Sequence, residues 1–402
     1  MILRKSRFKR FKGWLLSFIL IDVITLLTRF VESLFSKDKK ILTLFFTEFN
    51  YADNTRYLLE YLISIPTEDF KVRILVKNNK LFEQILKLHP NITFYTNSIS
   101  GFKLFFRTKN IVISHGSDTS YFFPYFLDVK SKNVINLWHG IPLKRLSLQV
   151  KEIRQSKSRN RFQKFTSICS SSTFEQFLLA SCFDMHIDNV WVTGTPRNDY
   201  LLHPNTELLT THTYLNNNVI LYAPTWREYG ERSSFFPFKD KDLVELNNFL
   251  ITQDAYLLIR GHREEMERIT GNYGQKSTYS RIVPAHQEIF PDAQKLLAHV
   301  DVLVTDYSSI YLDFLLLDKP MIFIPYDLEE YQSYRGFLFD YNSHTPGSKI
   351  STQKEFIQNI ELSLKNPSLY SEERLRVKNL FHTFQNGNSS KRILAKINEL
   401  NS

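Results

Sequence analysis

The chain has 402 residues, and at about 150 residues per domain this length suggests two or three domains. Hydrophobic residues make up 43% and charged residues 23%, a balance that excludes a largely disordered chain. Only 12 glycines and 14 prolines occur, which excludes collagen-like and low-complexity proteins. Two cysteines, Cys169 and Cys182, cannot form a disulfide scaffold or a four-cysteine metal site, so they favour a reducing, cytosolic environment.

The formal net charge of +10 is concentrated at the N-terminus. Six cations fall within the first 12 residues, no acid precedes Asp22, and the remaining 390 residues carry a net charge of only +4. The basic character is therefore partly local, and no recognition helix, zinc finger or aromatic RNA-binding strand accompanies it. The sequence predicts no nucleic-acid partner. The six cations are Arg4, Lys5, Arg7, Lys9, Arg10 and Lys12.

An apolar run of 14 residues, from Trp14 to Leu27, follows these cations and is interrupted by Asp22. A membrane-spanning helix needs roughly 20 apolar residues, so the run is short for a span. No alanine precedes Ala52, which disfavours a cleaved signal peptide. We predict a helix lying in the membrane interface, with its cations on anionic lipid. A core helix with a solvated basic end and a true span are the alternatives.

From Ile41 onward, short apolar runs alternate with helical patterns, which is typical of a parallel α/β sheet. A second series begins after the polar stretch 203–218, which is the predicted linker. The first series of predicted strands covers residues 41–46, 72–76, 92–95, 111–114, 134–138, 166–170 and 190–193; the second covers residues 219–222, 255–259, 301–305 and 320–324.

Five polar motifs follow predicted strands directly, and they come from both series. Ligands of open α/β sheets gather at the carboxyl ends of the strands. Motifs from both halves therefore predict one cleft between two domains. They are WHG at 138–140, GTPRND at 194–199, APTWR at 223–227, RGH at 260–262 and DYSSIYLD at 306–313.

His139 is the predicted general base. It stands at a strand end and is followed by Gly140 and Pro142, so a rigid turn would hold it. An imidazole with an ordinary pKa near 6.5 suits removal of a proton from an acceptor hydroxyl. The alternative is a buried histidine that hydrogen-bonds a loop carbonyl.

The motif that starts at Asp306 is a predicted phosphate cradle. Backbone N–H groups at the start of a helix, with the hydroxyls of Ser308 and Ser309, can bind a diphosphate without glycine. Asp313 falls one turn later and could accept hydrogen bonds from ligand hydroxyls. An ordinary helix cap made by the same residue types is the alternative.

Three arginines at strand ends, Arg197, Arg227 and Arg260, are further phosphate candidates, because guanidinium pairs bidentately with phosphate oxygens. His262 could hydrogen-bond or protonate a leaving phosphate. Each signal is weak alone, since a single arginine at a strand end is usually part of a surface ion pair.

A basic stretch from Lys144 to Lys164 follows the predicted base and carries eight cations against one acid, Glu152. It could hold an anionic acceptor or a lipid phosphate. A solvated surface loop is the alternative, since charge runs are usually solvated.

Other catalytic signatures are missing. The sequence has no P-loop and no Gly-x-Gly-x-x-Gly, which argues against a standard NTPase or dinucleotide enzyme. Asp240 and Asp242 have the spacing of a nucleotide-sugar metal motif, but their lysine-rich context indicates a solvated helix start. The remaining histidines lack paired spacing with acids or cysteines, so we expect no metal site and no cofactor.

The ordered motifs WHGIPLK, GTPRND, YAPTWR, RGH and DYSSIYLDF resemble those of the CDP-glycerol:polyol-phosphate glycerophosphotransferase family. The resemblance runs from about residue 136 to 340. It implies an α/β fold of GT-B architecture, in which two Rossmann-like domains face each other across a cleft. Together with the N-terminal segment and the predicted linker, this architecture predicts a membrane-associating segment at 1–40, an acceptor-side domain at 41–205 and a donor-binding domain at 206–402.

The resemblance also assigns roles to residues. It implies that His139 and His262 are catalytic. One departure is that Arg263 stands where the family often has proline, so the surroundings of His262 differ. Lys144, Arg227 and Asp306 are expected to support the site. The expected donor-binding residues are His139, Gly140, Ile141, Pro142, Arg197, Pro224, Thr225, Arg260, Gly261, His262, Ser308, Ser309 and Asp313.

The implied activity is transfer of a polyol phosphate, glycerol phosphate first, from a CDP-activated donor to a hydroxyl of a lipid-linked or glycan acceptor, with release of CMP. CDP-glycerol or CDP-ribitol is then a co-substrate, and the enzyme would work peripherally on the cytoplasmic face of the membrane in teichoic-acid or capsule synthesis. The alternatives are a ribitol-phosphate transferase, a GT-B glycosyltransferase that uses a nucleotide sugar, and a non-catalytic membrane-bound partner that retains the fold.

Overall fold

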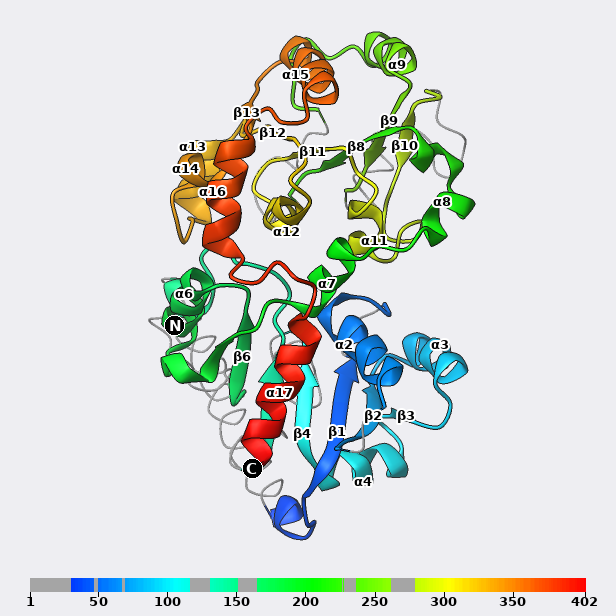
Figure 1. Cartoon of the computed structure of the whole chain (residues 1–402), viewed down its shortest axis with the longest axis vertical. Coiled ribbons are helices and arrows are strands. Elements are labelled where there is room, and N and C mark those ends of the chain that lie inside the picture. Colours follow the sequence, from blue (N-terminus) through cyan, green and yellow to red (C-terminus); the bar gives the residue numbers. More distant parts are fainter. Residues whose placement is uncertain are drawn as a thin grey trace, which may run out of the picture.

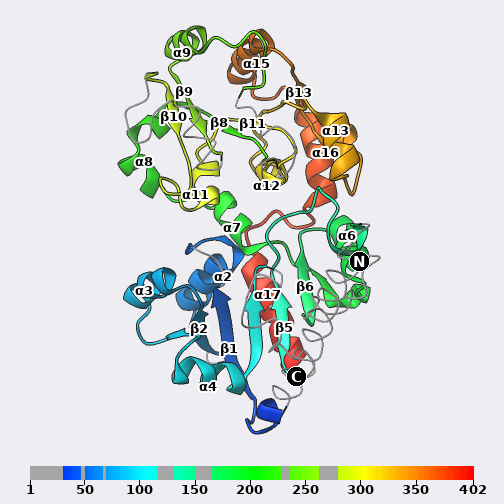
Figure 2. The same ribbon diagram turned by 180° about the vertical axis from the view of Figure 1, so that it is seen from behind.

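The computed structural model describes residues 30–46, 50–66, 69–115, 131–150, 165–225, 227, 236–261 and 279–402. They form two α/β domains, one above the other (Figures 1 and 2). No helix in these ranges is long and apolar enough to cross a membrane. The predicted interfacial helix and the cations before it lie outside the described residues.

The first domain is built on a seven-stranded sheet in the order β3-β2-β1-β4-β5-β6-β7, and every adjacent pair is parallel. The strands are β1 (Asp38–Phe46), β2 (Lys71–Val76), β3 (Thr93–Tyr95), β4 (Thr108–Ile113), β5 (Asn133–Asn136), β6 (Ser167–Ser170) and β7 (Val190–Val192). The helices of this half are α2 (Asp53–Ser64), α3 (Asn79–Leu88), α4 (Ile99–Arg107), α6 (Thr173–Phe183) and α7 (Pro196–Leu202).

The second domain has a six-stranded sheet in the order β10-β9-β8-β11-β12-β13, again with parallel pairs throughout. Its strands are β8 (Asn218–Ala223), β9 (Ala255–Ile259), β10 (Ile282–Pro284), β11 (Val302–Thr305), β12 (Met321–Phe323) and β13 (Ser348–Lys349). The helices are α8 (Glu207–Thr211), α9 (Leu243–Thr252), α11 (Ala293–Leu297), α12 (Ile310–Phe314), α13 (Leu328–Tyr334), α14 (Tyr341–His344), α15 (Gln353–Lys365), α16 (Ser371–Phe381) and α17 (Ser389–Asn401).

Both sheets are covered on both faces, which explains why their strands are apolar runs rather than alternating patterns. Leu44 belongs to the core on one face of the first sheet, and Phe45 belongs to the core on the other. In the second sheet, Leu221 likewise belongs to the core on one face and Tyr222 to the core on the other. Successive side chains of a strand point to opposite faces, so a strand with two cores must be apolar at every position.

The last helix, α17, leaves the second domain and packs on the first (Figure 1). Ile393 and Ile397 of α17 lie in the same core cluster as Leu44. The Asp199 carboxylate, on α7, accepts hydrogen bonds from the backbone N–H groups of Ser389 and Ser390 at 2.9 and 3.0 Å. The predicted second domain at 206–402 is thus corrected at its end, because α17 buries its apolar face in the first domain.

Residues 30–37, which the sequence assigned to the membrane segment, are packed against the first domain. Glu32 is buried and forms an ion pair with Lys132, a fully buried lysine just before β5, at 2.9 Å. Glu32 also pairs with Lys37, and the ring of Phe35 stacks on Phe106 with 5.5 Å between ring centroids. These contacts lie at the amino ends of β4 and β5, the edge of the sheet opposite its carboxyl ends.

Candidate active site

The polar motifs meet where the two domains face each other. Each follows the carboxyl end of a strand, and these ends point toward the junction of the domains (Figure 1). The predicted convergence of five motifs is therefore observed for the part of the chain that the structure describes. His139 follows β5, Arg197 follows β7, Thr225 follows β8, Arg260 follows β9 and Ser308 follows β11.

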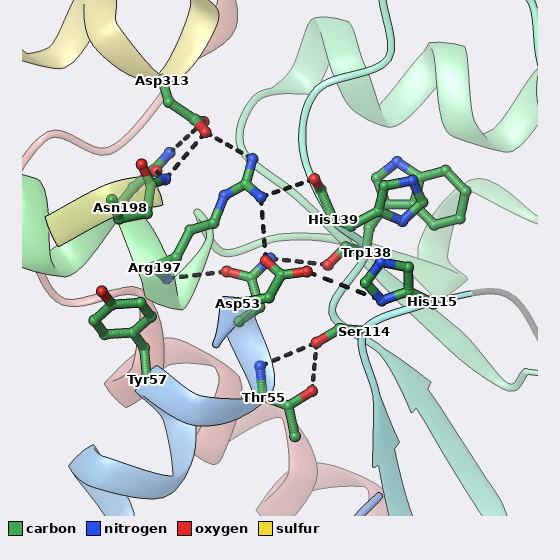
Figure 3. A network of polar contacts seen from close by, with 12 residues as sticks. Asp53, Thr55, Tyr57, Ser114, His115, Trp138, His139, Arg197, Asn198 and Asp313 are labelled. Atoms are coloured by element: carbon green, nitrogen blue, oxygen red, sulfur yellow. Dashed lines mark hydrogen bonds and ion pairs between the residues drawn. The ribbon is translucent and has the colours of Figure 1, made fainter. Parts of the chain in front are cut away.

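His139 lies in a tight turn that holds its ring in place. Trp138 before it has φ of 59° and Gly140 after it has φ of 127°, so the backbone reverses sharply at the end of β5. The imidazole stacks on the ring of His115 with centroids 4.5 Å apart and an interplanar angle of 6°. The ring of Trp138 lies 4.2 Å away, centroid to centroid (Figure 3).

The environment of His139 favours the neutral ring. The pKa of His139 is lowered to about 4, chiefly because the surrounding protein removes bulk water from the ring; the neighbouring His115 and Arg197 act in the same direction, and Asp53 opposes them. A hydrogen bond to the backbone of Ser114 orients the ring. The side chain remains exposed on one side, so a substrate can reach it. A neutral, oriented and accessible imidazole is the form that a general base requires.

Arg197 joins the two domains. Its Nη1 donates to Asp53 Oδ1 at 3.1 Å and to the carbonyl of His139 at 2.8 Å, and its Nη2 donates to Asp313 Oδ2 at 2.6 Å (Figure 3). Asp53 belongs to the first domain and Asp313 to the second. Burial alone would lower the pKa of Arg197, but Asp313 and Asp53 together raise it above its ordinary value. The arginine therefore stays charged and fixes the His139 turn relative to both domains.

Gly140 is required by this arrangement. A Cβ at this position would lie 2.4 Å from Nη2 of Arg197, and the φ of 127° is one that side chains rarely adopt. The predicted rigid turn is thus explained by two facts, a positive φ and the close approach of an arginine.

Two cavities of about 280 Å³ each meet at His139 and Ser309, which line both. The first, here called the carboxylate cavity, is lined by three aspartates and two arginines together with Ser308 and other residues. The second, here called the cationic cavity, is lined by three cations and by apolar residues on either side of them. The charged residues are Asp53, Asp292, Asp313, Arg197 and Arg260 in the carboxylate cavity, and Lys144, Arg145 and Arg335 in the cationic cavity.

The predicted donor residues divide between these cavities. Arg197, Arg260, Ser308, Ser309 and Asp313 line the carboxylate cavity. Gly140, Ile141 and Pro142 line the cationic cavity, together with Lys144, which was predicted to support the site. His262 lies outside the described residues, and Gly261 is the last described residue before it.

Pro224 and Thr225 follow β8 next to the DYSS motif. The Thr225 N–H donates to Asp306 Oδ1 at 2.8 Å, and its hydroxyl is buried without a hydrogen-bond partner among the described residues. Arg227 pairs with Asp306 and Asp327, each at 2.9 Å, so its guanidinium is held by two carboxylates. Arg227 and Asp306 thus hold the loop around Thr225.

The two serines do little for the helix that they precede. The Ser309 side chain caps no N–H group of α12, and Ser308 Oγ accepts only a long hydrogen bond of 3.5 Å from the Ile310 N–H. With five residues, α12 is too short for its dipole to carry the phosphate argument. The hydroxyls themselves and Arg260 are the groups that can hold an anion there. One nitrogen of Arg260 donates to the carbonyls of Ala285 and Phe290 at 3.0 and 2.9 Å.

Several residues of the site were missed in the sequence. Asp53 and Asn54 follow the end of β1, and the Asn54 side chain bridges the Trp138 carbonyl to the Arg197 N–H at 2.8 and 2.9 Å. Asn198 and Gln294 donate to the Asp313 carboxylate at 3.0 and 3.1 Å. His115, whose Nδ1 lies 3.9 Å from Asp53, is the ring under His139. Asp313 is thus already bonded by Arg197, Asn198 and Gln294.

Two facing domains with parallel sheets and a polar cleft between their strand ends define the GT-B architecture. A family model described as CDP-Glycerol:Poly(glycerophosphate) glycerophosphotransferase matches residues 26–399. The chain therefore belongs to this glycerophosphotransferase family. The predicted fold class, family and type of enzyme are confirmed.

Individual relatives agree with this assignment. The chain is 28% identical over 367 residues to a teichoic acid glycerol-phosphate transferase of Staphylococcus aureus, covering 86% of this chain and 90% of that protein. It is 30% identical over 245 residues to a teichoic acid poly(glycerol phosphate) polymerase of Bacillus subtilis, covering 56% of this chain but only 32% of the polymerase.

Solved structures support the fold. A structure of the wall teichoic acid polymerase TagF superposes with a TM-score of 0.74 at 24% identity, covering 91% of this chain and 90% of that one. A putative UDP-N-acetylglucosamine 2-epimerase from Listeria monocytogenes has the same general architecture, with a TM-score of 0.55 at 17% identity over 90% of this chain and 97% of that one. In the described ranges, no group of three or more histidine, cysteine, aspartate or glutamate side chains could hold a metal ion.

Proposed function

We propose that the protein transfers glycerol phosphate from CDP-glycerol to a hydroxyl of a lipid-linked acceptor and releases CMP. The observation that supports this proposal is the position of His139, whose imidazole has a lowered pKa and lies at the junction of two cavities. Its relatives are transferases and polymerases of teichoic acid units, which supports a wall-polymer product.

The proposed reaction is an in-line displacement at the β-phosphorus of the donor. His139 removes the proton of the acceptor hydroxyl as its oxygen bonds to phosphorus, and the phosphorus–oxygen bond to CMP breaks. Positioning and charge stabilisation supply most of the rate enhancement in phosphoryl transfer. Ser308, Ser309 and Arg260 would hold the diphosphate, and Thr225 would bond the nucleotide part with its buried hydroxyl. We assign His262 to the leaving phosphate on the motif alone.

One assay tests the proposal and separates it from its alternatives. The purified protein is given CDP-glycerol, CDP-ribitol or UDP-N-acetylglucosamine together with a soluble analogue of a lipid-linked acceptor. We expect CMP release with CDP-glycerol, and mass spectrometry should find one added glycerol phosphate or more. Turnover of CDP-ribitol in its place would identify a ribitol-phosphate transferase. Transfer from the nucleotide sugar, or no transfer at all, would refute the proposal.

The two serines of the predicted cradle provide a second test. Replacing Ser308 and Ser309 with alanine should weaken CDP-glycerol binding about ten-fold or more, because the charged diphosphate would lose the hydrogen bonds that the two hydroxyls donate. Calorimetric titration measures this affinity. Since neither serine makes a strong structural bond, the melting temperature should stay within about 2 °C of the unaltered protein. Ser333→Ala on α13 is the matched control, and an unchanged affinity of the double variant would remove the serines from the donor site.

We further propose that residues 1–29 attach the enzyme to the inner face of the membrane, where a lipid-linked acceptor would be found. Six cations followed by a short apolar run support this attachment, and each cation near an anionic surface contributes about 1 kcal/mol, which salt screens. Residues 30–37, which follow directly, pack on the first domain at its edge opposite the cleft.

Deletion of residues 1–29 should release the protein from anionic vesicles without loss of the fold, since Glu32 remains to pair with the buried Lys132. The truncated protein should keep its activity on a soluble acceptor and lose it on acceptor embedded in vesicles. Co-sedimentation and the two assays measure these effects. A longer deletion, of residues 1–35, is the comparison, because it should lower the melting temperature by leaving Lys132 unpaired. Equal co-sedimentation of the 1–29 deletion and the full chain would refute the membrane role.

A further inference from the structure

The cationic cavity differs sharply in charge from the carboxylate cavity beside it. Lys144, Arg145 and Arg335 line it, and among the lining residues that the structure describes none is an aspartate or glutamate. The carboxylate cavity is lined by three aspartates, and two of them, Asp53 and Asp313, pair with Arg197. The lining of the cationic cavity also includes the apolar residues Ile141 and Leu146.

The cationic cavity is assembled from both domains by direct backbone pairing. Lys144 forms an antiparallel bridge with Phe337. The Arg145 N–H donates to the carbonyl of Gly336 at 3.2 Å, and the Leu338 N–H donates to the carbonyl of Leu143 at 2.9 Å. This pairing joins the loop that carries His139 to the segment that follows α13, so two of the cations come from one domain and the third from the other.

Arg145 and Arg335 lie next to the backbone pairing between the two domains. Gly336 has φ of 65°, and a Cβ there would lie 2.8 Å from both Cδ and Nε of Arg145, so the Arg145 side chain runs across the glycine. Arg335 ends α13, and its N–H donates to the Tyr331 carbonyl at 2.8 Å. The Lys144 ammonium lies 5.6 Å from the centroid of the Tyr331 ring.

We propose that Arg145 and Arg335, with Lys144, form a phosphate-binding clamp that spans the two domains and binds a phosphate ester of one of the two substrates. This inference rests on the proposed function. Arginine forks suit phosphate oxygens, and a volume of about 280 Å³ suits a small phosphate ester. Because the cations belong to different domains, a bound phosphate also favours the arrangement in which the domains meet at His139.

Two sources of this phosphate have the same chemistry. One is the diphosphate of the CDP-activated donor, and the other is a glycerol phosphate already present at the end of the acceptor. An in-line displacement places the attacking oxygen and the leaving group on opposite sides of the phosphorus. His139 and Ser309 line both cavities, so one substrate can occupy one cavity and the second substrate the other.

The test uses the full chain and the variants Arg335→Gln and Arg145→Gln. Steady-state rates are measured with CDP-glycerol and two soluble acceptors, one ending in glycerol phosphate and one identical but without it. CDP-glycerol affinity is measured by titration. Arg107→Gln, an exposed arginine of α4, is the matched control, and Arg335→Lys tests whether charge alone suffices.

Loss of one charge-assisted arginine–phosphate contact should weaken the affected substrate about ten-fold or more. A rise in KM confined to the phosphate-bearing acceptor supports the clamp with the acceptor as the source, and weaker CDP-glycerol binding supports it with the donor as the source. Unchanged KM values and donor affinity in both arginine variants overturn the clamp, and so does an equal loss in Arg107→Gln. If the unaltered protein releases no CMP, the proposed function fails instead, and the two failures are thereby distinguished. Should one variant fail to fold, the other decides the outcome.

Discussion

Replacing His139 with alanine should reduce kcat by about 10²–10⁴-fold, the usual contribution of a general base, while CDP-glycerol still binds. The physical reason is that the ring is neutral, oriented by Ser114 and open to the junction of the two cavities. CMP release measures kcat, and calorimetric titration measures donor affinity. His186→Ala, at an exposed histidine of the same domain, is the matched control and should leave both unchanged.

The pH profile provides a second readout of the same base. Because the pKa of His139 is lowered to about 4, the ring remains a proton acceptor at neutral pH and loses this ability only as pH falls through about 4. The acid limb of kcat/KM should therefore lie well below the ordinary histidine value of about 6.5. Turnover of His139→Ala near that of the unaltered protein would exclude His139 as the base, whatever the profile.

Most strands could be predicted because burial on both faces makes each one a continuous apolar run. All 11 strands predicted in the sequence have counterparts, including the one at 255–259, which the structure reproduces residue for residue. The two strands that were missed are β10 and β13: β13 has only two residues, and β10 has only two apolar residues before Pro284, so neither shows a hydrophobic pattern. The return of α17 to the first domain was equally hidden, since it depends on Asp199 meeting Ser389, which is 190 residues later.

The candidate site was predictable where a motif follows a strand and hidden where side chains meet only in three dimensions. His115 had no spacing that marked it, but Ile113 of β4 is in register with Asn136 of β5, so the residues just beyond the two ends lie side by side. Asp53 looked like an ordinary acid in the first turn of a helix, and only its φ of 63° and its pairing with Arg197 distinguish it. The strand order alone would have been enough to predict that His115 lies beside His139. The Asp53–Arg197 pair could be found only from the full fold.

The second large effect is expected at Arg197. Replacing it with glutamine leaves Asp53 and Asp313 without their cation, and both carboxylates are mostly buried. Removing one partner of a buried ion pair typically costs about 3–5 kcal/mol, because the remaining charge stays desolvated. We expect a loss of that size in the free energy of unfolding of Arg197→Gln, measured by calorimetry and denaturant titration. Activity should fall as well, since the His139 carbonyl loses the hydrogen bond that fixes its turn.

A comparison of two arginines separates this buried network from a surface ion pair. Arg281 pairs with Asp254 at 3.1 Å, but that carboxylate is 66% exposed, so Arg281→Gln should cost no more than about 1 kcal/mol. In the double variant Arg197→Gln with Asp313→Asn, one of the two stranded carboxylates is gone, and part of the lost stability should return. The turn around His139 would still lack its guanidinium, so activity should remain low. Equal destabilisation by Arg197→Gln and Arg281→Gln would mean that solvent already screens the Arg197 pairs and that the junction of the domains is not held by them.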